Sequence, residues 1–544
     1  MHEIITVQLG QRSNYLATHF WNTQESYFTY SPEDPESPVN HDIHWRPGIG
    51  ADGHTETFMP RTVVYDLKGG FGSMRKINAL YESQDDPTRT SLWGGSTVVQ
   101  KQQPIEPSAY QQSLDSGLPP PTLTTSSVRY WSDYSRVYYH PRSVVQINEY
   151  EVNSSLMPFE RWSTGKELFD GIDKEHDIVD RDLRPFVEEA DQMQGIQVFT
   201  GLDDAWGGFA SEYTERLRDE YGKTVIWVWG LQEPIRRVSR PTKLLRLANK
   251  ARTLTEVYKQ ASIVIPLAVP SNLPRGIEID WGSAWHTGGL LASAIESVTL
   301  PSRLRESMGV NRDTLGGMTD LLNVMGKQTV AGLQMSFSSP PAAEDQPAQA
   351  DSRQPQQQVR LNGEDEEDGE GKGVHLDIDF SPSDHLDHKP WSDGYWKLKP
   401  KVFSQIIARR GYPDTDGRRD EDEDGDVEME MDQGERNRRR RPRGDEPVTQ
   451  TYNSTLRVPL LDSFPRIFKN TETGESISGD NGGLNVTTSL STDSSVSTRL
   501  KMLRQTVNMS FGVEDRETLM NDLAQMADEY HEGWSSGSDE GEDD

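Results

Sequence analysis

The sequence predicts an α/β protein, with a doubly wound domain over residues 1 to about 337 and an α+β C-terminal region that disordered acidic loops interrupt. Strands alternate with amphipathic helices through the first region. Two strands, VIWVWG (225–230) and SIVIPLAV (262–269), are continuous apolar runs, which suit a parallel sheet covered on both faces. Beyond residue 337, apolar stretches are separated by runs rich in Pro, Gln, Asp and Glu, which favour disorder.

The composition limits the classes of function. The chain has 544 residues, enough for two or three domains, and a formal net charge of -31. Because this excess of acid repels nucleic acid backbones and anionic membranes, we expect no direct nucleic acid binding. The absence of cysteine excludes disulfides, thiolate zinc sites and cysteine nucleophiles. We expect no transmembrane segment, since no apolar run is long enough, and the N-terminus resembles neither a secretory signal nor a presequence.

The first predicted elements are a strand at residues 3–9, a glycine turn at 10–14 and a helix that starts at residue 15. Residues 62–67 (TVVYDL) read as a short buried strand. An apolar stripe predicts a helix over 181–193, which Gly195 is expected to end before a strand at 196–199. The next helix is predicted by large apolar side chains four residues apart, namely Phe209, Tyr213, Leu217 and Tyr221.

The C-terminal region is predicted to be discontinuous. Residues 338–373 read as a disordered linker, 413–444 as a disordered charged loop and 531–544 as an acidic tail. Between them, 374–412 and 445–530 regain apolar and aromatic residues, and a helix is predicted over 516–530.

Three glycine-containing turns follow strands and could hold phosphate at the carboxyl edge of the sheet. The third one argues against this, because Asp203 and Asp204 place negative charge, and Trp206 places bulk, where a phosphate would bind. An acidic residue before a helix is ordinary capping chemistry, which is the interpretation we favour for this turn. The residues that suit a nucleotide site are Gly10, Gln11 and Asn14 in the first turn, Asp66, Gly69 and Gly70 in the second, and Gly207 and Gly208 in the third.

These stretches resemble tubulins. MHEIITVQLGQRSNYLATHFW is similar to the tubulin N-terminus, PRTVVYDLKGG (60–70) to a second tubulin motif, and 187–223 to the segment around the tubulin signature loop. A closer resemblance is to the Misato family, tubulin-related proteins known in fungi as Dml proteins. Its marks are VRYWSDYSRVYYHPRSV (128–144), DQMQGIQ (191–197) and DSFPRIF (462–468). The resemblance divides the first region into a tubulin-like N-terminal segment (1–120) and a Misato-type tubulin-like domain (121–337), and it implies a fold of the tubulin and FtsZ type.

The resemblance implies only a degraded nucleotide site. Gly10, Gln11 and Asn14 match the first tubulin nucleotide loop, and Asp66 matches the acidic residue of the third. The glycine-rich signature loop is replaced by LDDAWGG, in which only Gly207 and Gly208 correspond. GTP is therefore a conceivable cofactor that we do not favour, and we expect neither catalytic residues nor enzymatic activity.

Three other stretches are open to a structural and a functional interpretation. HLDIDFSPSDHLDH (375–388) holds histidines and aspartates without a known ligand spacing, so we expect a solvated loop and no metal site. RNRRRRPR (436–443) is either a nuclear localisation or anion-binding patch, or it neutralises the charge of the adjacent acidic run within a disordered loop. WSDYSRVYYHPRS (131–143) is either a binding surface or a folded insert that uses its aromatic residues as core.

The Misato resemblance implies a non-enzymatic role in mitochondrial inheritance, meaning the distribution of mitochondria and the partitioning of mitochondrial DNA. The expected location is the cytosolic face of the mitochondrion and the cytoplasm, with cytoskeletal tubulin or a cytosolic chaperonin as protein partners. Two alternatives remain: a GTP-binding switch or GTPase of the tubulin superfamily, and a factor for tubulin assembly and spindle formation.

Overall fold

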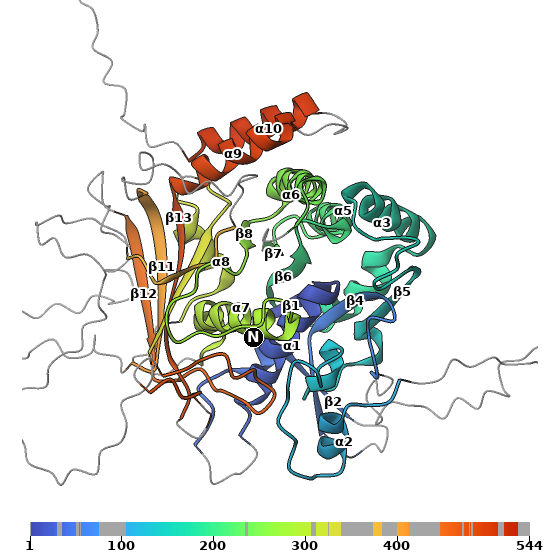
Figure 1. Cartoon of the computed structure of the whole chain (residues 1–544), viewed down its shortest axis with the longest axis vertical. Coiled ribbons are helices and arrows are strands. Elements are labelled where there is room, and N and C mark those ends of the chain that lie inside the picture. Colours follow the sequence, from blue (N-terminus) through green and yellow to red (C-terminus); the bar gives the residue numbers. More distant parts are fainter. Residues whose placement is uncertain are drawn as a thin grey trace, which may run out of the picture.

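The computed structural model describes residues 2–29, 35–49, 54, 56–74, 105–233, 238–305, 312–324, 326–338, 374–382, 400–412, 447–470, 473–477, 479, 482–509 and 516–530. The predicted loop at 413–444 and the tail at 531–544 lie outside these residues. The predicted linker at 338–373 does too, except that its first residue, Ser338, ends a strand. The α/β prediction is confirmed, with two sheets side by side (Figure 1).

The first sheet has six parallel strands in the order β5-β4-β1-β6-β7-β8. Strand β1 lies in its interior, and Val7 of β1 is opposite Val63 of β4 and Val198 of β6. Both the 1–120 and the 121–337 segments therefore contribute strands to one sheet. The strands are β1 (Glu3–Leu9), β4 (Thr62–Lys68), β5 (Val144–Glu151), β6 (Met193–Gly201), β7 (Val225–Leu231) and β8 (Ile263–Leu267).

Helices cover both faces of this sheet (Figure 1). On one face, Trp227 and Trp229 of β7 pack with residues of α1 (Gln11–Glu25) and α7 (Ala284–Thr299). On the other, Val228 packs with residues of three further helices. This alternation explains why the strands read as continuous apolar runs. The helices of the second face are α3 (Trp162–His176), α5 (Ala205–Glu220) and α6 (Arg240–Gln260).

Two predicted boundaries are wrong. The helix predicted over 181–193 is a π-helical turn at Val179–Leu183 followed by α4 (Arg184–Glu188), and the next strand already begins at Met193. Gly195 is a residue of this strand, and a side chain there would press on Leu315 and on the carbonyl of Val225 at 3.0 Å each. The first helix begins at Gln11 instead of residue 15, so the predicted glycine turn is reduced to Gly10.

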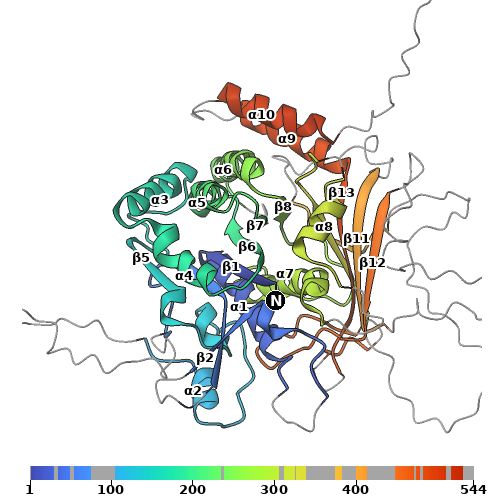
Figure 2. The ribbon, with the colours of Figure 1, turned by 180° about the vertical axis from the view of Figure 1, so that it is seen from behind.

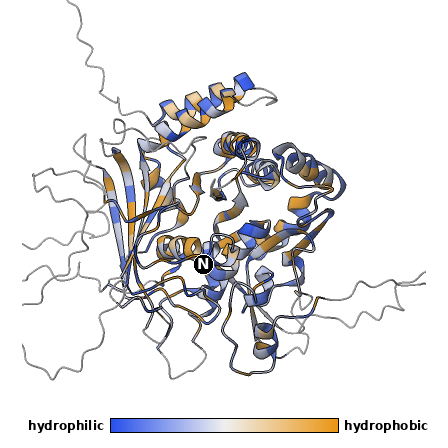
Figure 3. Ribbon diagram, viewed as in Figure 1, coloured by the Kyte–Doolittle hydropathy of each residue, from blue (hydrophilic) through white to orange (hydrophobic). Residues whose placement is uncertain are grey.

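The second sheet is mixed, in the order β10-β9-β13-β11-β12. Helix α7 lies between the two sheets and is hydrophobic along most of its length (Figure 3), as expected of a helix buried on several sides. The short helix α8 (Leu315–Leu322) also contacts both sheets. The strands are β9 (Gly332–Ser338), β10 (Ile378–Asp379), β11 (Val402–Arg410), β12 (Val448–Ser454) and β13 (Asn485–Asp493).

The last two helices, α9 (Ser495–Met509) and α10 (Arg516–Asp528), pack on each other and on α6, outside the sheets (Figure 2). Tyr530 anchors their end: its side chain is fully buried, and its hydroxyl accepts a hydrogen bond of 2.6 Å from the backbone N–H of Val330. The remaining elements are the hairpin of β2 (Trp45–Ile49) and β3 (Glu56–Pro60) and the helix α2 (Ala109–Asp115).

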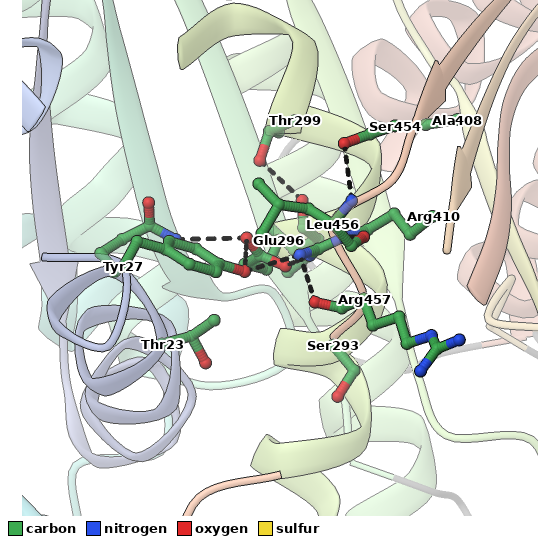
Figure 4. A network of polar contacts seen from close by, with 12 residues as sticks. Thr23, Tyr27, Ser293, Glu296, Thr299, Ala408, Arg410, Ser454, Leu456 and Arg457 are labelled. Atoms are coloured by element: carbon green, nitrogen blue, oxygen red, sulfur yellow. Dashed lines mark hydrogen bonds and ion pairs between the residues drawn. The ribbon is translucent and has the colours of Figure 1, made fainter. Parts of the chain in front are cut away.

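A buried ion cluster joins α1, α7 and the second sheet (Figure 4). The Glu296 carboxylate pairs with Arg303 at 2.7 Å and with Arg410 of β11. The Tyr27 hydroxyl accepts from Arg410 at 2.7 Å and donates to Glu296 at 2.9 Å. Neither arginine side chain is exposed, and each also donates to backbone, namely to the carbonyls of Glu296, Leu456 and Arg457. Such a cluster stabilises one arrangement of its elements, because removal of one partner leaves a buried charge that is no longer compensated.

No helix among the described residues is long and apolar enough to cross a membrane.

Candidate functional site

The predicted site residues of the first two turns lie together at the carboxyl ends of β1 and β4. Gly10 precedes α1 with a φ of 83°, a conformation that favours glycine. In the first turn of α1, the Gln11 amide donates to the Asp66 carboxylate at 2.6 Å and to the carbonyl of Gly70 at 2.9 Å. One turn further, the Asn14 amide donates to the same Asp66 oxygen at 2.8 Å.

Asp66 is the centre of this cluster. Its side chain also accepts from the indole of Trp131 at 3.2 Å and from the N–H of Leu67 at 2.8 Å. Burial raises the pKa of Asp66 to about 7, against the opposing effect of its hydrogen-bond donors. Four donors thus converge on a carboxylate that is fully buried. Three of these donors reach Oδ2 and the N–H of Leu67 reaches Oδ1, so the carboxylate is used as an acceptor within the protein.

The two glycines of the second turn have different surroundings. Gly69 has a φ of 85° and open space where a side chain would begin. A side chain on Gly70 would overlap Asp66 and the Gln11 amide, so glycine is needed there for the cluster to close.

Tryptophan fills the space beside the first turn. A side chain on Gly10 would overlap the indole ring of Trp206, the second residue of α5. The Trp206 side chain is buried and packs against Phe159 and Phe209, with ring centroids 5.2 and 5.6 Å apart. Glycine lets another group come close to the backbone at this position, and here that group is the indole of Trp206.

An ion cluster occupies the third turn. Arg12 pairs with Asp203, with 2.7 Å between Nη1 and Oδ1, and with Asp204. Asp204 caps α5 by accepting from the N–H of Trp206 at 3.0 Å, and Asp203 accepts from the N–H of Glu233 at 3.1 Å. The capping interpretation of this acidic turn is confirmed. The two carboxylates raise the pKa of Arg12 although its side chain is partly buried.

Gly207 and Gly208 serve close helix packing. A side chain on Gly207 would overlap the hydroxyl of Thr253 in α6, and one on Gly208 would overlap the carbonyl of Trp162 in α3. Gly165 of α3 is likewise pressed against the carbonyl of Ala205. The two glycines that correspond to the tubulin signature loop therefore face neighbouring helices.

These residues do not fit a bound GTP. The N-terminus of α5 is where a phosphate would be expected, since free N–H groups and the helix dipole favour anions there. In this chain that end carries Asp204, the adjacent Asp203 and the bulk of Trp206. The arrangement is a cluster of side chains that hydrogen-bond and form ion pairs with one another.

Sequence reasoning missed two members of this site, Arg12 and Trp131. The signal for Arg12 was the acidic pair Asp203–Asp204, which needs a cation when β1 and β6 are neighbours. Trp131 belongs to the aromatic insert, in which Tyr134 and Tyr139 are also buried while Tyr138 is 54% exposed. The interpretation of this insert as core is thus correct for most of its aromatic residues.

The histidine and aspartate stretch at 375–388 is described only up to residue 382. In that part Asp377 accepts from the Ser336 hydroxyl at 2.8 Å, and Asp379 from the N–H of Ser381 at 2.8 Å. Among the described residues, no group of three His, Asp or Glu side chains could hold a metal ion.

Comparisons with known proteins cover nearly the whole chain. Residues 2–116 match the family model described as the Misato Segment II tubulin-like domain, and residues 120–304 match one described as a tubulin domain. The chain is 60% identical to Protein dml-1 of Neurospora crassa and 46% identical to Protein DML1 of Gibberella zeae, over 100% of both chains in each case. It is 35% identical to Protein dml1 of Schizosaccharomyces pombe, over 56% of this chain and 66% of that relative.

Proposed function

This chain belongs to the Misato/Dml family of tubulin-like proteins, and we propose that it acts in mitochondrial inheritance as a non-enzymatic protein that works without a bound nucleotide. Inheritance here means the distribution of mitochondria and the partitioning of mitochondrial DNA. Family membership supports the cellular role. The observation that supports nucleotide independence is the third turn, where Arg12, Asp203 and Asp204 form ion pairs and Trp206 fills the space beside Gly10.

A GTP-binding switch is the rival function, and one observation favours it. Gln11, Asn14 and Asp66, which match tubulin nucleotide loops, do lie together in space. The N–H groups of both amides are, however, directed at Asp66, since both amides donate to the same carboxylate oxygen.

Calorimetric titration of the full chain with GTP and Mg²⁺ separates the two functions. The full chain is required because α7 and the ion cluster around Glu296 join both sheets. We expect no heat of binding and no shift of the thermal unfolding midpoint, with tubulin as the positive control. Micromolar binding that is lost in the Gln11→Ala/Asn14→Ala variant would overturn nucleotide independence and support the switch.

The cellular role is tested by complementation. A Neurospora crassa strain that lacks Protein dml-1 would receive this chain, the Gln11→Ala/Asn14→Ala variant or an empty vector. We expect the wild-type chain and the variant to restore mitochondrial distribution and mitochondrial DNA content equally. Rescue by the wild type alone would favour the switch, and a strain without any mitochondrial defect would overturn the role in inheritance.

The proposed place of action is the cytosolic face of the mitochondrion, with a further pool in the cytoplasm. The proposed protein partners are cytoskeletal tubulin or a cytosolic chaperonin. The same two partners are expected if the chain is instead a tubulin-assembly or spindle factor. Fractionation and affinity purification after gentle lysis test both points. Recovery of tubulin with spindle defects but normal mitochondria would favour the alternative.

A further inference from the structure

An open groove of about 1090 Å³ lies where β11 and β12 end, at the lower ends of these strands in Figure 1. One wall comes from the end of α1 and Tyr27 just beyond it, and another from the segment 455–462, which follows β12. Asp66 and its partners do not line this groove, and the proposed function does not depend on it. Glycines also line it, namely Gly411, Gly479, Gly482 and Gly483.

The Arg457 guanidinium lies in this groove without a partner. The backbone carbonyl of Arg457 accepts a hydrogen bond of 2.9 Å from Arg410, but its guanidinium has no hydrogen bond or ion pair in the part of the chain that the structure describes. In Figure 4 its side chain extends away from the buried ion cluster. The second arginine of the groove, Arg136, is already held, at 3.3 Å from Glu25 and 2.8 Å from Asp462. Arg457 is therefore the arginine of this groove that is available to an anion.

Three glycines surround the Arg457 side chain. A side chain on Gly411 would begin 3.1 Å from its Cγ, one on Gly482 3.1 Å from its Nη1, and one on Gly483 3.3 Å from its Cβ. These distances are shorter than a favourable contact between carbon atoms. The arginine thus lies along bare backbone, which limits the positions that its guanidinium can take.

Apolar side chains lie in the same groove. Leu456, Leu460 and Leu461 line it and are partly exposed. A partly exposed leucine buries more apolar surface when a ligand covers it. The groove thus combines an unpaired cation with apolar surface, which suits a ligand that carries a carboxylate beside a large apolar side chain.

We propose that this groove binds an extended segment of a partner protein in which Asp or Glu lies next to a large apolar residue. The carboxylate would pair with the Arg457 guanidinium, whose planar fork matches its geometry, and the apolar residue would pack on the leucines. Charge complementarity argues for this occupant, because a basic or uncharged segment would leave Arg457 without a partner. A protein segment is favoured over a small carboxylic acid, since a groove of about 1090 Å³ is much larger than such a molecule.

The first experiment compares two capped peptides by ligand-observed NMR with the full chain. They are Gly-Ser-Leu-Glu-Leu-Ser-Gly and the same peptide with Gln in place of Glu, which keeps the apolar side chains and removes the charge. We expect the Glu peptide to bind at least fivefold more tightly than the Gln peptide. Equal binding of the two peptides, or no binding of the Glu peptide, would overturn the proposal.

Two variants and a control locate the site. Arg457→Gln is expected to weaken binding of the Glu peptide at least fivefold and to leave the thermal unfolding midpoint unchanged, because the guanidinium has no partner to lose. Leu461→Ser should weaken binding of both peptides about threefold. Arg466→Gln, the same change at an exposed arginine outside the groove lining, should leave binding unchanged.

Two results of these variants count against the proposal. An equal loss in Arg466→Gln and Arg457→Gln would mean bulk attraction to basic side chains. Unchanged binding in Arg457→Gln or in Leu461→Ser would remove the charge or the apolar surface from the site. Each of these results would overturn the proposal.

A further variant tests the chain itself as the occupant. The acidic run at 420–432 (DEDEDGDVEMEMD) has the proposed chemistry and follows Gly411 in the sequence. Replacing its Asp and Glu residues with Asn and Gln should change the affinity for the Glu peptide by less than threefold at physiological ionic strength. A larger gain that disappears when Arg457→Gln is added would assign the groove to this run and overturn the assignment to a partner.

Discussion

The indole of Trp206 lies where a side chain on Gly10 would have to begin. Gly10 directly follows the interior strand β1, and Trp206 is the second residue of α5, the helix that follows the neighbouring strand β6. In a nucleotide-binding sheet, a glycine at this point keeps the backbone open to phosphate. Here the Trp206 side chain fills that opening, so the position is part of the hydrophobic core and is not open to a ligand.

Replacing Gly10 tests this packing. Gly10→Ala should lower the free energy of unfolding by about 2 to 4 kcal/mol, because alanine disfavours a φ of 83° and its methyl group overlaps Trp206. Gly171→Ala is the matched control: Gly171 is exposed in α3 with open space around it, so this change should stabilise by about 0.5 to 1 kcal/mol. Urea unfolding measures both. Equal stability of Gly10→Ala and the wild type would contradict the packing.

Asp66 predicts a pH dependence of stability. Its pKa in the folded chain is about 7, raised from 3.8 by burial. Between about pH 4 and pH 7 the folded chain holds a proton that the unfolded chain has released, so this group makes the free energy of unfolding fall as the pH rises. The fall amounts to about 4 kcal/mol at most, from about 1.4 kcal/mol per pKa unit.

Urea unfolding at pH 5, 6, 7 and 8 for the wild type and Asp66→Asn isolates this contribution. The wild type should lose stability relative to the variant as the pH rises through this range. The buried histidines His19 and His44 have lowered pKa values and act in the opposite direction, but they are present in both proteins and cancel in the difference. A difference that stays constant with pH would show that Asp66 does not titrate in this window.

The buried ion cluster predicts a large and non-additive effect. Arg410→Met should destabilise by about 3 to 5 kcal/mol, because Glu296 then keeps a buried charge with one partner fewer. Lys469→Met, which breaks a surface pair with Glu278, should cost no more than about 1 kcal/mol. The double variant Arg410→Met/Glu296→Gln should lose less than the sum of its single changes. Strict additivity in urea unfolding would argue against a coupled cluster.

Tyr530 predicts a local effect at the C-terminal helices. Tyr530→Phe leaves the buried N–H of Val330 without its acceptor, which should cost about 1 to 3 kcal/mol. Hydrogen exchange should speed up most in α9 and α10, because Tyr530 fixes their end to the body. Tyr258→Phe removes a hydroxyl that donates to the carbonyl of Lys327 near the surface and should have a smaller effect. Equal exchange in the two variants would contradict the anchoring role.

The strands of the first sheet could be predicted well, because the patterns that mark each strand lie within the strand itself or in the residues next to it. The continuous apolar runs of β7 and β8 reflect helices on both faces, and Gly10 marked the end of β1. Gly195 was misread because a glycine after a helical stripe is normally a helix end, whereas here it lies inside β6, where Leu315 and the carbonyl of Val225 leave little room for a side chain.

The contacts that close the candidate site could not be predicted from local patterns. Arg12 and Asp203 are far apart in sequence and meet only because β1 and β6 are neighbours in the sheet. Trp131 donates to Asp66 from the aromatic insert, and no periodic pattern in the insert predicts which way its side chains point. The cluster of Glu296 and Arg410 depends on where the second sheet packs against α7, which hydrophobic periodicity leaves open.

The interior position of β1 has a consequence for the order of synthesis. This strand leaves the ribosome well before its partner β6, which begins only at Met193. At about 5 to 20 residues per second, translation needs roughly 10 to 40 seconds to cover that distance. For this time an apolar strand has one edge without its neighbour, and such an unpaired edge is where partly folded chains tend to aggregate.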